Sequence, residues 1–151
     1  MAGKVARDEE LRSKFIPMIV SEAKKRGVVT GNATRGWTIR KTVASGIKMI
    51  YVVRMLEARV EMWIHLGSSA VEFDESSGMF DHFYAKKDQI ENAYGEELNW
   101  DNPGRRTAFS IQQDYYDFDL RDTDKWSMWV EKMVSDMEKL DAALKPHYIS
   151  N

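Results

Sequence analysis

Residues 80–100 read FDHFYAKKDQIENAYGEELNW. They begin a longer stretch that ends at Pro146, and the pattern of this stretch decides the fold. Aromatic and aliphatic residues recur there at helical spacing, among them Phe80, Ile90 and Tyr94. This spacing predicts a helix from residue 77 or 78 to residue 94. Gly95 follows directly and is typical of the residue that ends a helix.

Downstream of Gly95 the periodicity changes from helical to alternating. We predict a short strand over residues 98–100, a turn at Asn102, and a second strand over residues 106–113. A Trp-rich apolar stripe then predicts a helix over residues 123–144 that Pro146 ends. Such a stripe is more often core than a groove for a partner.

Upstream, residues 8–26 predict a helix, because acidic residues lie at its start and basic residues at its end. Pro17 predicts a kink there, or a shorter helix that begins near Pro17. Three strands joined by short connections follow, over residues 36–40, 48–53 and 59–66. The predicted fold is α+β in the order α-βββ-α-ββ-α. It has an antiparallel sheet of about five strands packed against helices, and residues 1–151 form one domain.

Composition restricts the classes of function. The chain carries 22 Lys and Arg against 24 Asp and Glu, a formal net charge of -2. A positive field over the whole protein is therefore absent, and nucleic acid could bind only at a local basic patch. It contains no cysteine, which excludes disulfides, thiolate catalysis and thiolate-bound zinc. No apolar run is long enough for a membrane span and no signal-peptide core begins the chain. We therefore expect a cytoplasmic protein without a membrane partner.

Four segments resemble a prokaryotic family that is known mainly as a domain of unknown function. They are RVEMWI (59–64), FDHFY with KKDQIE (80–84 and 86–91), GEELNW (95–100) and WSMWVEKM (126–133). In that family the domain commonly follows a segment similar to a PD-(D/E)XK nuclease. The resemblance implies a link to DNA processing, with the domain here as a standalone protein. It brings no established catalytic residue.

The candidate catalytic and metal-binding motifs each have a simpler explanation. The nearest string to a nuclease motif is Glu22-Ala23-Lys24, which falls on a predicted helix without a strand-borne Asp before it. The three histidines lie far apart in the sequence, so zinc is not expected. An acidic group precedes the last helix but lacks the Gly and Glu positions of a calcium loop. We instead predict that Asp122 or Thr123 caps that helix and that the remaining acids stabilise its positive end: Asp114, Asp117, Asp119 and Asp124. We predict no metal and no cofactor.

Basic and aromatic residues in or beside the predicted strands form the one candidate binding surface. Arginines neutralise phosphates, and an exposed Trp on the same strand face stacks on a base. Glu57 and Glu61 dilute the positive charge, and pairing of Glu61 with an Arg is an ordinary surface arrangement. The candidate nucleic-acid-binding residues are Arg40, Lys48, Arg54, Arg59, Trp63, Arg105 and Arg106.

These observations predict a non-enzymatic interaction module, with nucleic acid as a candidate ligand and DNA-processing or defence systems as its setting. Two alternatives stay open. The first is a protein–protein or homodimerisation module that uses apolar surface of the last helix or an open sheet edge. The second is a divalent-metal-dependent nuclease, which lacks a recognisable motif.

Overall fold

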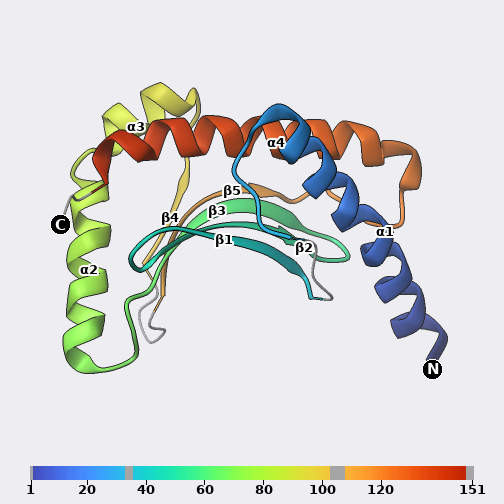
Figure 1. The fold of residues 1–151 in the computed structure, drawn as a ribbon, viewed down its shortest axis with the longest axis horizontal. Helices are drawn as coiled ribbons and strands as arrows, with labels where there is room; N and C mark the ends of the chain where they lie inside the picture. Colours follow the sequence, from blue (N-terminus) through green and yellow to red (C-terminus); the bar gives the residue numbers. More distant parts are fainter. Residues whose placement is uncertain (1, 33–35, 103–107, 149–151) are drawn as a thin grey trace.

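The computed structural model describes residues 2–32, 36–102 and 108–148, with side chains from residue 8 onward. The predicted α+β class and element order are confirmed. Figure 1 shows the elements, which are α1 (Ala2–Arg26), β1 (Thr38–Ala44), β2 (Ile47–Val53), β3 (Ala58–Ile64), α2 (Ala70–Tyr84), α3 (Lys87–Tyr94), β4 (Asn99–Asp101), β5 (Phe109–Tyr115), and α4 (Trp126–Leu144), with short 3-10 turns at Thr123–Lys125 and Lys145–His147.

The five strands form one antiparallel sheet in the order β1-β2-β3-β5-β4. The first three strands make the predicted meander, and Gly46 takes a left-handed conformation, with φ of 76°, in the tight β1–β2 turn. The sheet is arched in Figure 1, with α4 along its convex side and with α1 and α2 at its two ends. The concave side faces away from α4.

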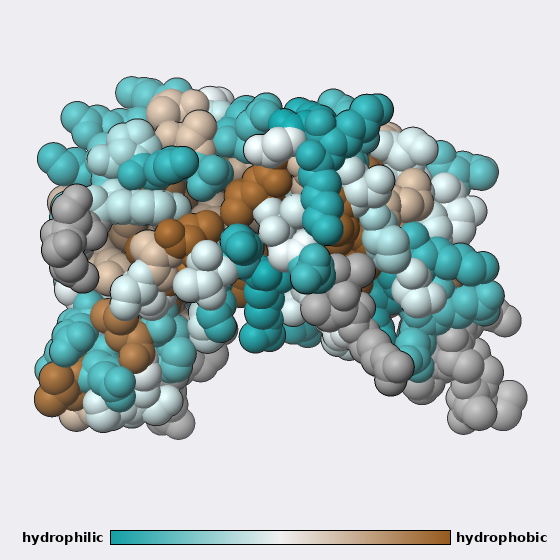
Figure 2. All heavy atoms as spheres, in the orientation of Figure 1, coloured by the Kyte–Doolittle hydropathy of each residue, from teal (hydrophilic) through white to brown (hydrophobic). Residues whose placement is uncertain are grey.

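The hydrophobic core lies between the sheet and α4. Alternate residues of each strand point into it, because successive strand side chains point to opposite faces. From β2 and β3 these include Met49, Tyr51, Val60 and Met62, each at most 1% exposed. The apolar stripe of the last predicted helix packs into this core. Its residues are all buried: Trp126, Trp129, Val130, Met133, Met137, Leu140 and Leu144. Figure 2 shows apolar surface mainly in the seam below the helical layer and near the lower end of α2.

α1 is longer than predicted and runs through Pro17. A helix that begins near Pro17 is therefore wrong. Pro17 itself is exposed, whereas Phe15, Ile16 and Ile19 are buried against the rest of the core. This burial offsets the hydrogen bond that proline removes.

The single helix predicted from residue 77 or 78 to residue 94 is wrong in two respects. α2 begins earlier, because Ser69 and Glu72 form a capping box in which each side chain bonds the backbone of the other. The helical segment is also divided between Tyr84 and Lys87. α2 packs on β3 and β5 whereas α3 packs on α4, so one straight helix does not serve both contacts.

The last helix is preceded by one 3-10 turn, Thr123–Lys125, rather than by an acidic cap. Asp122 occupies the N-cap position of that turn but makes no side-chain capping hydrogen bond. Asp119 instead accepts hydrogen bonds from the backbone and guanidinium of Arg121. These bonds hold the pKa of Asp119 below its usual range.

Glu91 joins α3 to β4. Its Oε2 accepts hydrogen bonds from the Leu98 amide at 2.7 Å and from Trp100 Nε1 at 3.1 Å. Lys87 Nζ lies 3.3 Å from the other carboxylate oxygen. Burial alone would raise the pKa of Glu91, but these three partners together hold it below its usual range.

Replacing Met133 tests the core, with Met128 on the same helix as a matched control. Met133 is 0% exposed and Met128 is 47% exposed. We expect Met133→Ala to lower the free energy of unfolding by about 2–5 kcal/mol in urea titrations. Met128→Ala should change it by less than about 0.5 kcal/mol. Equal losses for the two variants would contradict the described packing of α4.

Replacing Glu91 tests the α3–β4 junction. Glu91→Gln should cost about 1–3 kcal/mol near neutral pH, because the amide carries no charge and its NH2 group would face the Lys87 ammonium in place of the second carboxylate oxygen. A lowered folded-state pKa gives stability that is complete above the unfolded pKa, about 4.3, and is lost as the pH falls through the folded value. The difference from the parent chain should therefore close in acid. Glu97→Gln is the control, because Glu97 is exposed. A stability difference between Glu91→Gln and the parent chain that did not change with pH would contradict the lowered pKa of Glu91.

Candidate interaction site on the open sheet face

The concave side of the sheet, which we call the open face, carries the side chains that alternate with the core. Strand register places them in three rows across the sheet. The first row runs Thr42, Lys48, Trp63, Ser110 and Asp101; the second runs Arg40, Ile50, Glu61, Gln112 and Asn99; the third runs Thr38, Val52, Arg59 and Asp114. In Figure 1 the open face lies between α1 and α2, on the side away from α4.

A buried carboxylate lies at the centre of the open face. Glu61 is only 4% exposed and accepts a hydrogen bond from Arg59 Nε at 3.0 Å. Ser110, 6% exposed, places its hydroxyl 2.9 Å from the same carboxylate oxygen. A buried carboxylate is costly unless it is paired and hydrogen-bonded. Here Arg59 of the same strand supplies the charge, and Ser110 of the neighbouring strand β5 supplies a further hydrogen bond.

The polar network continues from Ser110 toward β4. The Ser110 hydroxyl also lies 2.7 Å from Gln112 Oε1, and Gln112 Nε2 donates to Asp114 Oδ1 at 2.8 Å. Asn99 Nδ2 donates to the other oxygen of Asp114 at 3.1 Å. Ser110 has one proton but faces acceptor oxygens of both Glu61 and Gln112. The Ser110 hydroxyl therefore donates to only one of these two oxygens at a time.

A cation–aromatic pair occupies the first row. Lys48 Nζ lies 5.3 Å from the centroid of the half-buried Trp63 ring. The His65 ring is tilted against Trp63 with centroids 5.0 Å apart. Trp63 is therefore on the open face rather than under a helix, and its immediate surroundings include a flexible ammonium group.

The structure brings four of the seven predicted site residues to the open face and separates the others. Arg40, Lys48, Arg59 and Trp63 share that face, although Arg59 is engaged by Glu61. Arg54 lies in the β2–β3 turn, exposed, with Nε 3.8 Å from Glu57 Oε1. Arg105 and Arg106 lie outside the described residues.

Sequence reasoning missed the polar residues of β5 as members of the site. The signal was present, because Phe109 and Ile111 alternate with Ser110 and Gln112. What the sequence did not reveal was the partner of β5. β5 pairs with β3, and this register sets Ser110 opposite Trp63.

A second buried carboxylate lies in the helical layer. Asp136 is 4% exposed and accepts a hydrogen bond from the Tyr115 hydroxyl at 2.5 Å. Lys132 and Lys139 lie 3.4 and 3.3 Å from its two oxygens. Burial, followed by the charge and hydrogen bond of Asp136, raises the pKa of Tyr115. These contacts fasten α4 to the sheet.

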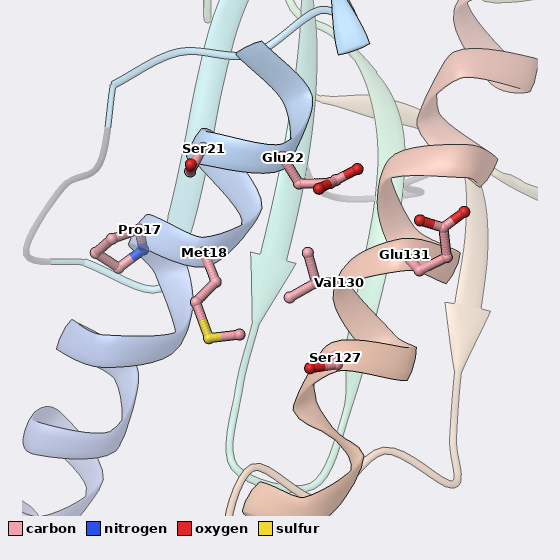
Figure 3. Close-up of a pocket in the computed structure, with 7 residues that line it drawn as sticks. All are labelled: Pro17, Met18, Ser21, Glu22, Ser127, Val130 and Glu131. Carbon is pink, nitrogen blue, oxygen red and sulfur yellow. The ribbon is translucent and has the colours of Figure 1, made fainter. Parts of the chain in front are cut away.

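Figure 3 shows a cavity of about 430 Å³ between α1 and α4. Met18 and Val130 give it an apolar floor, while Glu22 and Glu131 face each other across it. Arg26 already lies 3.3 Å from Glu131 and 4.0 Å from Glu22. The cavity is therefore the seam of a helix pair whose two facing carboxylates share the guanidinium of Arg26.

The described part of the chain contains no cluster of three or more His, Asp or Glu side chains able to hold a metal ion. The nuclease-like string Glu22-Ala23-Lys24 lies on α1, with Lys24 exposed and Ala23 in the core. Among the helices described, none combines the length and apolar character needed to cross a membrane.

Comparisons with known proteins identify the family. No curated protein matches the chain in sequence. A crystal structure of YbjN from E. coli, described as a proposed transcription regulator, aligns over 84% of this chain and 90% of that one. Their sequence identity is 10% and the TM-score is 0.33. Residues 11–148 match the family described as domain of unknown function DUF4268, and the chain therefore belongs to that family.

Proposed function

We propose that this protein is a non-enzymatic interaction module whose open face binds single-stranded nucleic acid. The observation that carries the proposal is the pairing of Lys48 with a half-buried Trp63 on the sheet face opposite α4. A base stacks on Trp63 and displaces the ammonium group, which then meets a phosphate. Arg40, exposed in the neighbouring row, supplies a second phosphate contact.

The distribution of charge favours a short, stacking-dependent contact. Arg40 and Lys48 lie on β1 and β2, whereas Asp114 and Asp101 lie on β5 and β4. The positive charge of Arg59 is balanced by Glu61. We therefore propose that phosphates lie over β1 and β2. Arg54, in the β2–β3 turn, remains a proposed contributor, as do Arg105 and Arg106, which lie outside the described residues.

The roles of the buried carboxylates support recognition rather than catalysis. Glu61 and Asp136 are each engaged by cations and hydroxyl groups of their own chain. Family resemblance favours a cytoplasmic, single-domain accessory to DNA-processing or defence systems. In that setting the module binds a nucleic-acid strand, and a separate protein carries out the reaction on the DNA.

A protein partner or a second copy is the other candidate occupant. Two large side chains at the β2–β3 end favour it: Leu56 is 58% exposed and Tyr116 is 76% exposed. Tyr116 lies close to Asp114 and Glu57, and both carboxylates raise the pKa of its hydroxyl, Asp114 the more strongly. Light scattering across a range of concentrations distinguishes self-association from a monomer.

Charge reversal on the open face tests the proposed surface. The double variant Arg40→Glu with Lys48→Glu should weaken binding of a single-stranded oligonucleotide more than about tenfold at low salt in fluorescence polarisation. Lys41→Glu with Lys25→Glu is the matched control, because it reverses the same number of charges. Lys41 is exposed and adjacent to Arg40 but alternates to the other side of β1, and Lys25 is exposed on α1. Equal effects of the two changes would rule out the open face.

Removing the aromatic ring tests the stacking contribution. Trp63→Leu keeps apolar volume and should cost about 1–3 kcal/mol of binding free energy, with circular dichroism to confirm the fold. The salt dependence should be shallow, with a slope of log affinity against log salt near about -1.4 for two phosphates. A slope steeper than roughly -3 would show that charges beyond Arg40 and Lys48 dominate.

A further inference from the structure

We infer that the cavity between α2, the β1–β2 turn and Tyr148 binds a small, neutral, mostly apolar molecule that carries one hydrogen-bond acceptor. The cavity has a volume of about 390 Å³, which is within the usual range for small-molecule sites. Its lining residues are not those of the open-face rows, so this inference does not depend on the proposed function. In Figure 1 the β1–β2 turn faces α2 near the C-terminal end of the chain.

Two hydrogen-bonded contacts hold the walls of this cavity in place. The Leu66 amide donates to Ser76 Oγ at 2.9 Å, and Ser76 is 0% exposed, so the segment that follows β3 is tied to α2. His82 Nε2 lies 2.8 Å from the carbonyl oxygen of His147, which ties the C-terminal 3-10 turn to the same helix. The chain itself therefore fixes the walls, and a ligand does not have to assemble them.

A glycine leaves space on the α2 side of the cavity. Gly78 lies inside α2, where glycine destabilises a helix relative to alanine. Among the described residues, no atom beyond its chain neighbours and its own helix backbone lies within 4 Å of the position that a Cβ at Gly78 would take. Helix stability would therefore favour alanine, and glycine keeps the space open. Most of the remaining wall is apolar: Ala44, Ile47, Leu66 and Met79.

Tyr148 brings an unsatisfied donor to the wall. Its ring packs edge-on against Phe83, with ring centroids 6.4 Å apart. Among the described residues, its hydroxyl is the one buried side-chain oxygen or nitrogen without a hydrogen-bond partner, and such a group destabilises the fold. Burial, followed by the charge of Asp141, raises the pKa of Tyr148 to about 12. The hydroxyl is therefore protonated near neutral pH, and a ligand acceptor would supply the missing bond.

The charges near the cavity favour a neutral ligand. Glu75 lines it, and Asp141 places negative charge near the Tyr148 hydroxyl, so both carboxylates repel an anion. An ammonium group has no lone pair to accept the hydroxyl proton, and an apolar wall costs any ion its hydration. The ligand class that fits is an uncharged carbonyl compound with a small apolar body.

Acetophenone, ethylbenzene and benzoate test this class, because they share a benzene ring and differ in the group attached to it. NMR titrations of the full chain near neutral pH, following the Leu66 and Gly78 amides, should give about fivefold tighter binding of acetophenone than of ethylbenzene. That ratio is what one hydrogen bond supplies. Benzoate should bind at least about tenfold more weakly than acetophenone, because its charge meets Glu75 and an apolar wall. Equal affinity for acetophenone and ethylbenzene, or no binding of either, would overturn the inference.

Variants at two positions locate the site. Tyr148→Phe should reduce the affinity for acetophenone to that for ethylbenzene without lowering the urea midpoint, because the hydroxyl has no partner to lose. Gly78→Leu should abolish binding of both by filling the cavity. Ala85→Leu is the matched control, because Ala85 is exposed and does not line the cavity.

Gly78→Ala covers the case in which leucine disturbs α2. It should raise the urea midpoint and still weaken acetophenone binding, because alanine favours the helix and its methyl group enters the open space. Acetophenone binding that is unchanged in both Gly78 variants would place the probe elsewhere on the protein and overturn the inference.

Discussion

Burial of one face of the sheet against α4 is the constraint on which the rest of the structure depends. Each strand contributes alternate residues to that face, so the intervening residues must point to the opposite side. Met62 and Ile64 enter the core, and Glu61 and Trp63 are thereby placed on the open face. A one-residue slip of β3 would exchange the two sets, so core packing also fixes the composition of the candidate site.

The polar groups of the open face are hydrogen-bonded by other side chains of the sheet. Glu61 is buried there because Arg59 and Ser110 reach it from β3 and β5. Pairing of β3 with β2 places Trp63 beside Lys48. The open face therefore carries basic and aromatic side chains on β1–β3 and a hydrogen-bonded polar network that extends onto β5 and β4.

The sequence predicted much of the fold because its strongest signals are local. Alternation marks β3, Gly95 marks the end of α3, and the apolar stripe marks α4. The early start of α2 depends on a capping box at Ser69 and Glu72 that was overlooked. The division between α2 and α3 has no Gly or Pro signal, because it arises from packing against two different layers.

The candidate site was less predictable because it depends on strand pairing. Arg59, Glu61 and Trp63 share a face by alternation alone, but the contact of Ser110 with Glu61 requires β3 to pair with β5. Arg54 follows β2 in the sequence yet lies in the turn beyond the sheet. Local pattern therefore identified residues of the right type, and register determined which of them act together.

The most direct measurement is an NMR titration of the labelled protein with a short oligodeoxycytidine, following backbone amides and the five Trp indole signals. The account predicts that Lys48, Ser110 and the Trp63 indole shift together while the α4 amides of Met133 and Met137 stay in place. Shifts confined to α4 or the α1–α4 seam would contradict it, as would a spectrum unchanged at saturating oligonucleotide.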